Sequence, residues 1–138
     1  MGSLSAEARR VRRERRALIR NGTATESDFD AEIDAQGREL SAAVEERKQI
    51  DSKLEAAETR QAKYEKELEE CKTALAAERS PAAIADLRNE KERLEASIKD
   101  VLEKKEDLRE DRRPLAARIK ELGADIAALK QQMGAWHD

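Results

Sequence analysis

Apolar side chains recur along two long stretches of the chain at alternating steps of three and four residues. The first stretch, 26–79, carries the repeat from Phe29 to Leu75, and the second, 80–138, carries it from Ile84 to Trp136. This spacing is the heptad period of coiled-coil helices. A disordered chain shares the low mean hydropathy of this sequence but imposes no such period. The pattern therefore predicts an all-α fold built on two long coiled-coil helices.

The repeat is interrupted at Ser80 and Pro81. In one continuous helix it would resume at Ala82, but it resumes at Ile84, a slip of two residues. Serine as N-cap and proline as the first helical residue form a standard helix start. A rod would need a kink and a phase defect together, whereas a helical hairpin explains both. We therefore expect an antiparallel hairpin whose tip consists of Arg79, Ser80, Pro81, Ala82 and Ala83.

Folding the chain about Pro81 brings the two repeats into register. Leu75 then lies opposite Leu87, and Leu54 lies opposite Leu108, so that a positions meet d positions as an antiparallel coiled coil requires. A parallel dimer would instead stack Lys105 on the Lys105 of a second copy. The register therefore favours the hairpin.

Cations interrupt the apolar repeat in the second helix. We expect Lys105 and Arg112 to lay their aliphatic stems along the seam, the line of contact between the two long helices, and to reach solvent with their charged ends. Glu46 and Asp111 are the expected counter-ions of Arg112. Pro114 leaves the repeat in phase, which predicts a kink and not a second turn.

The N-terminal segment, 1–25, predicts a short amphipathic helix. Leu4, Val11 and Leu18 recur every seven residues, Ser5 suits the N-cap, and Gly22 suits the turn that ends the helix. Thr25 and Asp28 form a capping box for the next helix. A turn this short predicts that the following long helix runs back nearly antiparallel to the short one.

Extra small or apolar residues beside the seam indicate where this short helix packs. A two-helix seam does not need them, whereas a third helix would cover them. We therefore expect the N-terminal helix to pack at the base of the hairpin, on Ala31, Ala35, Val44, Ala117, Ala124, Ala127 and Ala128.

Charge is distributed unevenly along the chain. The formal net charge is −3, yet residues 1–20 hold seven arginines against two glutamates. Three interpretations compete for the cluster: pairing with carboxylates of the long helices, binding to nucleic-acid phosphates, or binding to an anionic membrane. Residues 1–6 resemble a myristoylation pattern, which would add to membrane binding, and an Arg-rich start also suits organellar targeting. The candidate anionic-surface contacts are Arg9, Arg10, Arg12, Arg13, Arg15 and Arg16.

Chemistry-bearing residues are sparse. His137 is the single histidine, and Cys71 is the single cysteine, which occupies a seam position and is expected to pack as a small apolar residue, with an inter-chain disulfide as the alternative. No phosphate loop, metal-ligand spacing or catalytic set occurs, so we expect no catalytic residue, no cofactor, no metal and no small-molecule substrate. Neither a transmembrane run nor a secretion signal is recognisable, and the cysteine usage favours a reducing intracellular compartment.

These observations define two functional hypotheses. The first is a non-enzymatic coiled-coil structural, scaffolding or accessory subunit that acts through protein–protein interaction, in a larger assembly or as a homo-oligomer. The alternative is an adaptor whose Arg-rich N-terminal helix binds nucleic acid or an anionic membrane surface.

Overall fold

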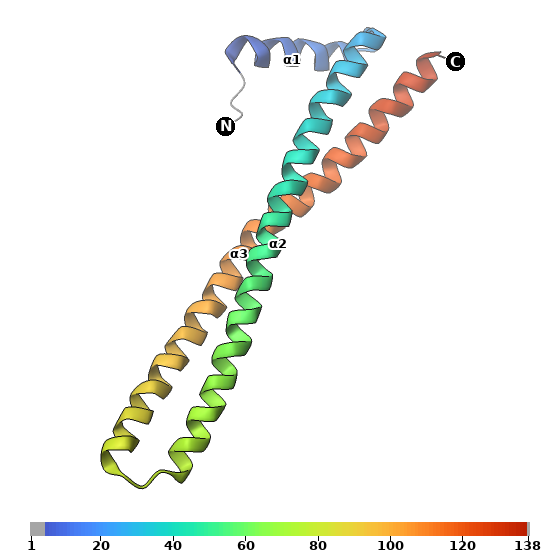
Figure 1. Cartoon of the computed structure of the whole chain (residues 1–138). Coiled ribbons are helices and arrows are strands. Elements are labelled where there is room, and N and C mark those ends of the chain that lie inside the picture. Colours follow the sequence, from blue (N-terminus) through green and yellow to red (C-terminus); the bar gives the residue numbers. More distant parts are fainter. Residues whose placement is uncertain (1–4, 138) are drawn as a thin grey trace. The chain divides into compact units, whose positions relative to one another are not determined.

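The computed structural model describes residues 5–137, apart from the side chains of residues 136 and 137. This part of the chain consists of α1 (Ala6–Arg20), α2 (Glu26–Ala77) and α3 (Pro81–His137) and contains no strand (Figure 1). Helices α2 and α3 pack against each other, as a hairpin requires, and the all-α prediction is confirmed. The predictions for residues 1–4 and for the side chains of Trp136 and His137 lie outside the described residues.

Side-chain hydroxyls cap the start of every helix. Ser5 and Ser80 each accept a hydrogen bond from a backbone N–H in the first turn of α1 and α3, at 3.1 and 3.5 Å. At the start of α2, Thr25 Oγ1 accepts from the Asp28 N–H at 3.2 Å, and Asp28 accepts from the Thr25 N–H at 2.9 Å. Hydrogen bonds from the backbone and the hydroxyl of Thr25 lower the pKa of Asp28. The expected capping box is therefore confirmed.

Gly22 ends α1 in the left-handed conformation, with a φ of +74°. The Gly22 N–H donates to the Ile19 carbonyl at 3.2 Å, and the Thr23 N–H donates to the Leu18 carbonyl at 3.0 Å. These two bonds form a Schellman motif and satisfy carbonyls that the helix end would otherwise leave unpaired. Residues 21–25 then lead directly into α2.

An acidic side chain, that of Glu78, accepts the backbone hydrogen bonds of the turn between α2 and α3. Helix α2 ends at Ala77, two residues before Arg79, where the sequence had placed its end. The Glu78 carboxylate accepts from the N–H groups of Ser80 and Arg79 at 3.1 and 3.0 Å, and these bonds lower the pKa of Glu78. Helix α3 begins at Pro81; residues 79–82 are exposed and residue 83 is half-buried.

The chain forms two compact units, residues 1–46 with 115–138 and residues 47–114. In the unit of residues 47–114, α2 and α3 run antiparallel from their connecting turn (Figure 1). Its buried apolar residues are Ile50, Ala57, Cys71, Leu94 and Val101. All five lie on the predicted repeat, so the heptad positions define the buried face.

Lys105 departs from its expected environment. Its side chain does not reach solvent: the residue is 8% exposed, and Nζ donates to Gln61 Oε1 at 2.9 Å. The Cys71 thiol, which packs in the same seam as expected, donates to the Leu87 carbonyl at 3.2 Å. Polar groups on this seam are thus satisfied across the helix pair.

Arg112 also has a partner that the sequence did not suggest. It pairs with Asp51 at 2.9 Å and not with Glu46 or Asp111. Asp51 lies on the facing helix beside the seam, so a short reach across the pair satisfies both charges. Helix α3 continues through Pro114, and the expected kink there stays a prediction.

In the unit of residues 1–46 and 115–138, a small apolar cluster joins the three helices. Ala24, Phe29 and Leu129 are buried, and Ile19, Ile33 and Met133 pack around them. Ile19 is the apolar residue through which α1 reaches this cluster. Helix α1 then leaves obliquely from α2 and does not return alongside it as expected (Figure 1).

The face of α1 that packs differs from the predicted apolar stripe. Val11 and Leu18 are 46% and 40% exposed, whereas Arg12 and Arg15 are partly buried. On α3, the small residues expected beneath α1 are exposed: Ala117, Ala124, Ala127 and Ala128. Because α1 packs on α2 through charged residues, it leaves this part of α3 uncovered.

Candidate functional site: an arginine-lined groove

Glu32 on α2 is the carboxylate that fixes α1. It is 1% exposed and accepts hydrogen bonds from Arg12 Nε, Arg15 Nη2 and Arg16 Nε, each at 3.1 Å. Residues three and four apart share one face of a helix, so the three guanidinium groups converge on one point. Three charged side chains of α1 therefore contact α2 at one buried carboxylate.

The environment of Glu32 keeps its carboxylate ionised. Burial alone would raise its pKa, but hydrogen bonds from Arg12, Gln36, Arg16 and Arg15 outweigh that effect and lower the pKa to about 2. Gln36 contributes through Nε2, which donates to Glu32 Oε2 at 3.1 Å. The carboxylate is thus charged throughout the neutral range.

Glu39 extends this network by two turns along α2 and connects it to α3. Arg12 donates to Glu39 as well as to Glu32, and Arg118 Nη2 of α3 donates to Glu39 Oε2 at 2.9 Å. Burial opposes the charge of Arg12, but its bonds to Glu32 and Glu39 outweigh burial and raise the pKa of Arg12. All three helices of this unit therefore meet at one charge network.

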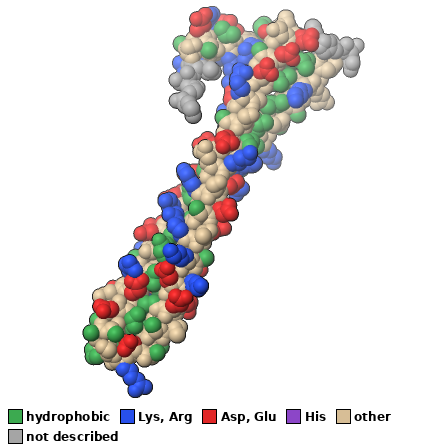
Figure 2. Space-filling model, in the orientation of Figure 1, with side chains coloured by type: hydrophobic (Ala, Val, Ile, Leu, Met, Phe, Trp, Pro, Cys, Tyr) green, Lys and Arg blue, Asp and Glu red, His purple; other side chains and the backbone are tan. Residues whose placement is uncertain are grey.

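An open groove of about 1000 Å³ lies beside this network. Figure 2 shows Lys and Arg side chains gathered where α1 meets α2. The groove is lined by six arginines, one carboxylate and four small or apolar residues: Arg9, Arg12, Arg15, Arg16, Arg38, Arg118, Glu39, Ala8, Val11, Ala35 and Ala42. We call this feature the arginine groove.

The positive charge of the arginine groove is only partly neutralised. Glu32 and Glu39 are the carboxylates that its arginines contact, and both are shared between several guanidinium groups. Within residues 5–135, Arg9 and Arg38 form no ion pair, and the buried Nε of Arg15 has no hydrogen-bond partner. The groove therefore has capacity for further anionic groups.

The predicted anionic-surface residues divide between two environments. Arg9, Arg12, Arg15 and Arg16 line the arginine groove. Arg10 is exposed and pairs within α1, with Glu7 at 3.8 Å and Glu14 at 3.3 Å. Arg13 is exposed and lies outside the groove lining. The tip residues 79–83 belong to the other compact unit.

Sequence reasoning did not single out Glu32, Glu39, Arg38 or Arg118. A signal for the first two exists: Glu32, Gln36 and Glu39 follow one another at steps of four and three residues, so Gln36, a position of the heptad repeat, shares one helix face with both glutamates. A glutamate next to a seam is ordinarily solvated. The buried contact becomes evident only in the structure, where Arg12, Arg15 and Arg16 of α1 meet Glu32.

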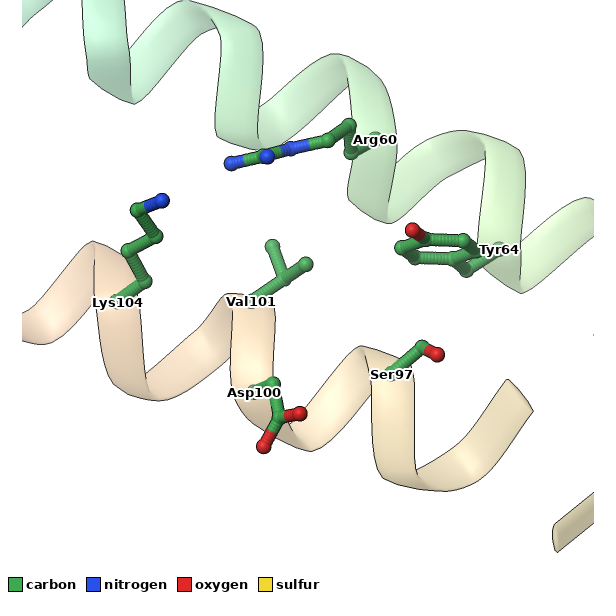
Figure 3. A pocket seen from close by; sticks show the side chains of 6 residues that line it. All are labelled: Arg60, Tyr64, Ser97, Asp100, Val101 and Lys104. Atoms are coloured by element: carbon green, nitrogen blue, oxygen red, sulfur yellow. The ribbon is translucent and has the colours of Figure 1, made fainter. Parts of the chain in front are cut away.

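A second hollow lies on the unit of residues 47–114 (Figure 3). Arg60 and Tyr64 of α2 line it on one side, and residues of α3 that include Val101 and Lys104 line it on the other. The volume of this hollow is about 230 Å³. Ligand pockets commonly enclose about 300–1,000 Å³ of mostly apolar wall. This hollow is smaller, and its lining mixes both charges, so we do not assign it a ligand.

Within residues 5–135, no group of three or more His, Cys, Asp and Glu side chains is arranged to hold a metal ion. No helix in the described part of the chain is long and apolar enough to span a membrane. Comparison of the chain with protein-family models, with curated proteins and with solved structures finds no significant match.

Proposed function

We propose that the chain is a non-enzymatic structural, scaffolding or accessory subunit that acts by binding other proteins. The observation that carries this proposal is its ratio of surface to core. The accessible surface is 10001 Å², against roughly 7,200 Å² expected for a folded monomer of this mass. Three of the ten buried apolar residues in the described part are alanines, and a binding partner would add to so small a core.

The proposal includes an antiparallel coiled coil between α2 and α3. Its support is that apolar residues of the heptad repeat are buried on both helices, among them Ile50 on α2 and Leu94 and Val101 on α3. The Lys105–Gln61 hydrogen bond joins a repeat position of α3 to one of α2. Buried polar pairs of this kind fix register and orientation in coiled coils.

Cross-linking in the cells that express the protein tests the proposed function. Exposed lysines of α2, such as Lys53 and Lys66, would be coupled to neighbouring proteins and the products identified by mass spectrometry. We expect reproducible cross-links to one partner, which is either another protein or a second copy of the chain. Recovery of the chain as a free monomer without intermolecular cross-links would contradict the proposal.

A second candidate function is an adaptor for nucleic acid or an anionic membrane. The observation that favours it is that Arg9 and Arg13 are exposed on α1 and form no ion pair within the described residues. Binding of this kind weakens as salt is added, because counter-ions are released. Salt-dependent binding to duplex DNA or to phosphatidylserine vesicles, lost in Arg9→Ala/Arg13→Ala, would support it; no binding at low salt would exclude it.

A further inference from the structure

We infer that the arginine groove binds an acidic, amphipathic helix of a protein partner. This inference rests on the proposed function, protein binding, and assigns it a surface and a partner chemistry. The residues that line the groove come from α1, from the first part of α2 and from Arg118 of α3, and all lie within the unit of residues 1–46 and 115–138.

Charge complementarity supplies the first argument. Six arginines line the groove and Glu39 is its single lining carboxylate, whereas Glu32 is buried and does not line it. Hydrogen bonds between guanidinium groups and carboxylates are charge-assisted and are stronger than bonds between neutral groups. A partner with a row of Glu or Asp side chains would satisfy Arg9 and Arg38, which have no ion pair within residues 5–135.

Apolar lining supplies the second argument. Val11 is 46% exposed and lines the groove together with Ala8, Ala35 and Ala42. An amphipathic helix docks apolar residues at i, i+3, i+4 and i+7 into a groove of this kind while its charged residues meet the rim. A phosphate backbone would use the arginines but would gain nothing from Val11. The mixed lining therefore favours a polypeptide over nucleic acid.

Size supplies the third argument. A helix has a diameter of about 10 Å and a rise of 1.5 Å per residue, so a space of about 1000 Å³ accommodates roughly two helical turns. The small side chains of Ala8, Ala35 and Ala42 leave room for a backbone to approach. Two turns present enough positions for two or three carboxylates and one apolar anchor.

The test uses the full chain and a dye-labelled helical peptide of about 16 residues, with leucines on one face and glutamates on the other. Three probes accompany it: the same peptide with serines in place of leucines, a duplex DNA, and vesicles of phosphatidylserine and phosphatidylcholine. Fluorescence anisotropy and vesicle co-sedimentation at about 0.15 M salt measure binding. We expect the leucine–glutamate peptide to bind most tightly.

Paired variants locate the binding. Arg9→Glu/Arg38→Glu reverses two groove charges that form no ion pair in the described structure, and we expect it to weaken peptide binding by about tenfold or more. Arg13→Glu/Lys48→Glu makes the same charge change on exposed residues of α1 and α2 outside the groove lining, and we expect it to bind like the wild type. Circular dichroism confirms equal helix content.

A second pair separates the apolar contribution. Val11→Ser should weaken binding of the leucine–glutamate peptide but leave the serine–glutamate peptide unaffected. Leu102→Ser alters a residue of nearly the same exposure, 47% against 46%, in the other compact unit, and should change the binding of neither peptide. Equal loss in both variants would overturn the inference.

Other outcomes have defined meanings. No binding of the leucine–glutamate peptide, equal binding by the Arg9→Glu/Arg38→Glu variant, or tighter binding of DNA or vesicles overturns the acidic-helix inference. Sedimentation that shows a dimer dissociated by Arg9→Glu/Arg38→Glu overturns it in favour of a second copy. Cellular cross-links that persist in this variant would leave the proposed protein-binding function standing while the groove assignment fails.

Discussion

The buried carboxylate of Glu32 turns part of the basic cluster on α1 into a packing contact with α2. It is 1% exposed, and its three arginine partners are on α1, a helix that has no buried residue of its own. Glu32→Gln keeps the side-chain shape but leaves Arg12 and Arg15, both 16% exposed, without their main counter-charge. Breaking a buried ion pair commonly costs about 3–5 kcal/mol. We expect this variant to release α1, seen as faster hydrogen exchange of its amides.

Glu14→Gln is the matched control for that substitution. Glu14 pairs with Arg10 on the exposed side of α1, and such surface pairs contribute less than about 1 kcal/mol. Exchange in α1 should therefore remain slow in this variant. Equal exchange rates in both variants would show that apolar packing of Ile19, and not Glu32, holds the helix.

The pKa of Glu32 predicts an acid dependence of the same contact. Because the folded-state pKa, about 2, lies below the ordinary value of 4.5, the folded state binds this proton less readily than the unfolded state does. The stabilisation by ionised Glu32 is complete above pH 4.5 and is lost as the pH falls towards 2. The difference in α1 protection between wild type and Glu32→Gln should thus be constant near neutrality and shrink across this interval. A difference that is the same at both ends would contradict it.

Among the helical elements, the turn after α1 depends on one glycine. Gly22 has a φ of +74°, so Gly22→Ala would strain the backbone by about 1 kcal/mol or more, whatever space surrounds it. Gly123 lies inside α3, and a methyl group there meets nothing within 4 Å. Gly123→Ala should instead stabilise by about 0.5–1 kcal/mol, because alanine restricts the unfolded chain. Thermal unfolding followed by circular dichroism measures both; shifts of the same sign would contradict the assignment of Gly22.

The long helices follow from the sequence because periodicity and caps act locally. Ile50, Leu94 and Leu122 are buried at the positions that the repeat assigns, and Ser80 with Pro81 begins α3. Helix α2 ends two residues before the expected position because Glu78, a good helix former, accepts hydrogen bonds from the turn amides instead. Glu78 could either extend or terminate the helix, and the heptad period carries no information on which of the two occurs.

The arginine groove could be predicted only in part. The basic cluster is evident in the sequence, but its division between groove and solvent depends on which face of α1 meets α2. The stripe of Val11 and Leu18 suggested the wrong face, since Arg12 and Arg15 are drawn to buried Glu32. Arg38 and Arg118 join them through tertiary placement, which spacing along one helix does not reveal.

For the whole molecule, the division into two compact units has an energetic consequence. The apolar cluster around Phe29 and Leu129 and the seam containing Leu94 and Val101 are in different units. Each unit buries a small core of its own, and regions with separate cores open separately, in cooperative groups of contacts. A change in one core should therefore affect the stability of its own unit first.

Leu94→Ala tests this separation. Leu94 is 3% exposed, and truncating a buried leucine costs at least about 2 kcal/mol through lost burial and the cavity left behind. We expect faster hydrogen exchange across residues 47–114 and unchanged exchange in α1, the reverse of the pattern expected for Glu32→Gln. Leu102→Ala, at a site that is 47% exposed, is the control and should alter exchange in neither unit. If Leu94→Ala accelerated exchange equally in both units, α2 and α3 would be coupling them into one cooperative structure, and a partner bound at either unit would then stabilise the whole chain.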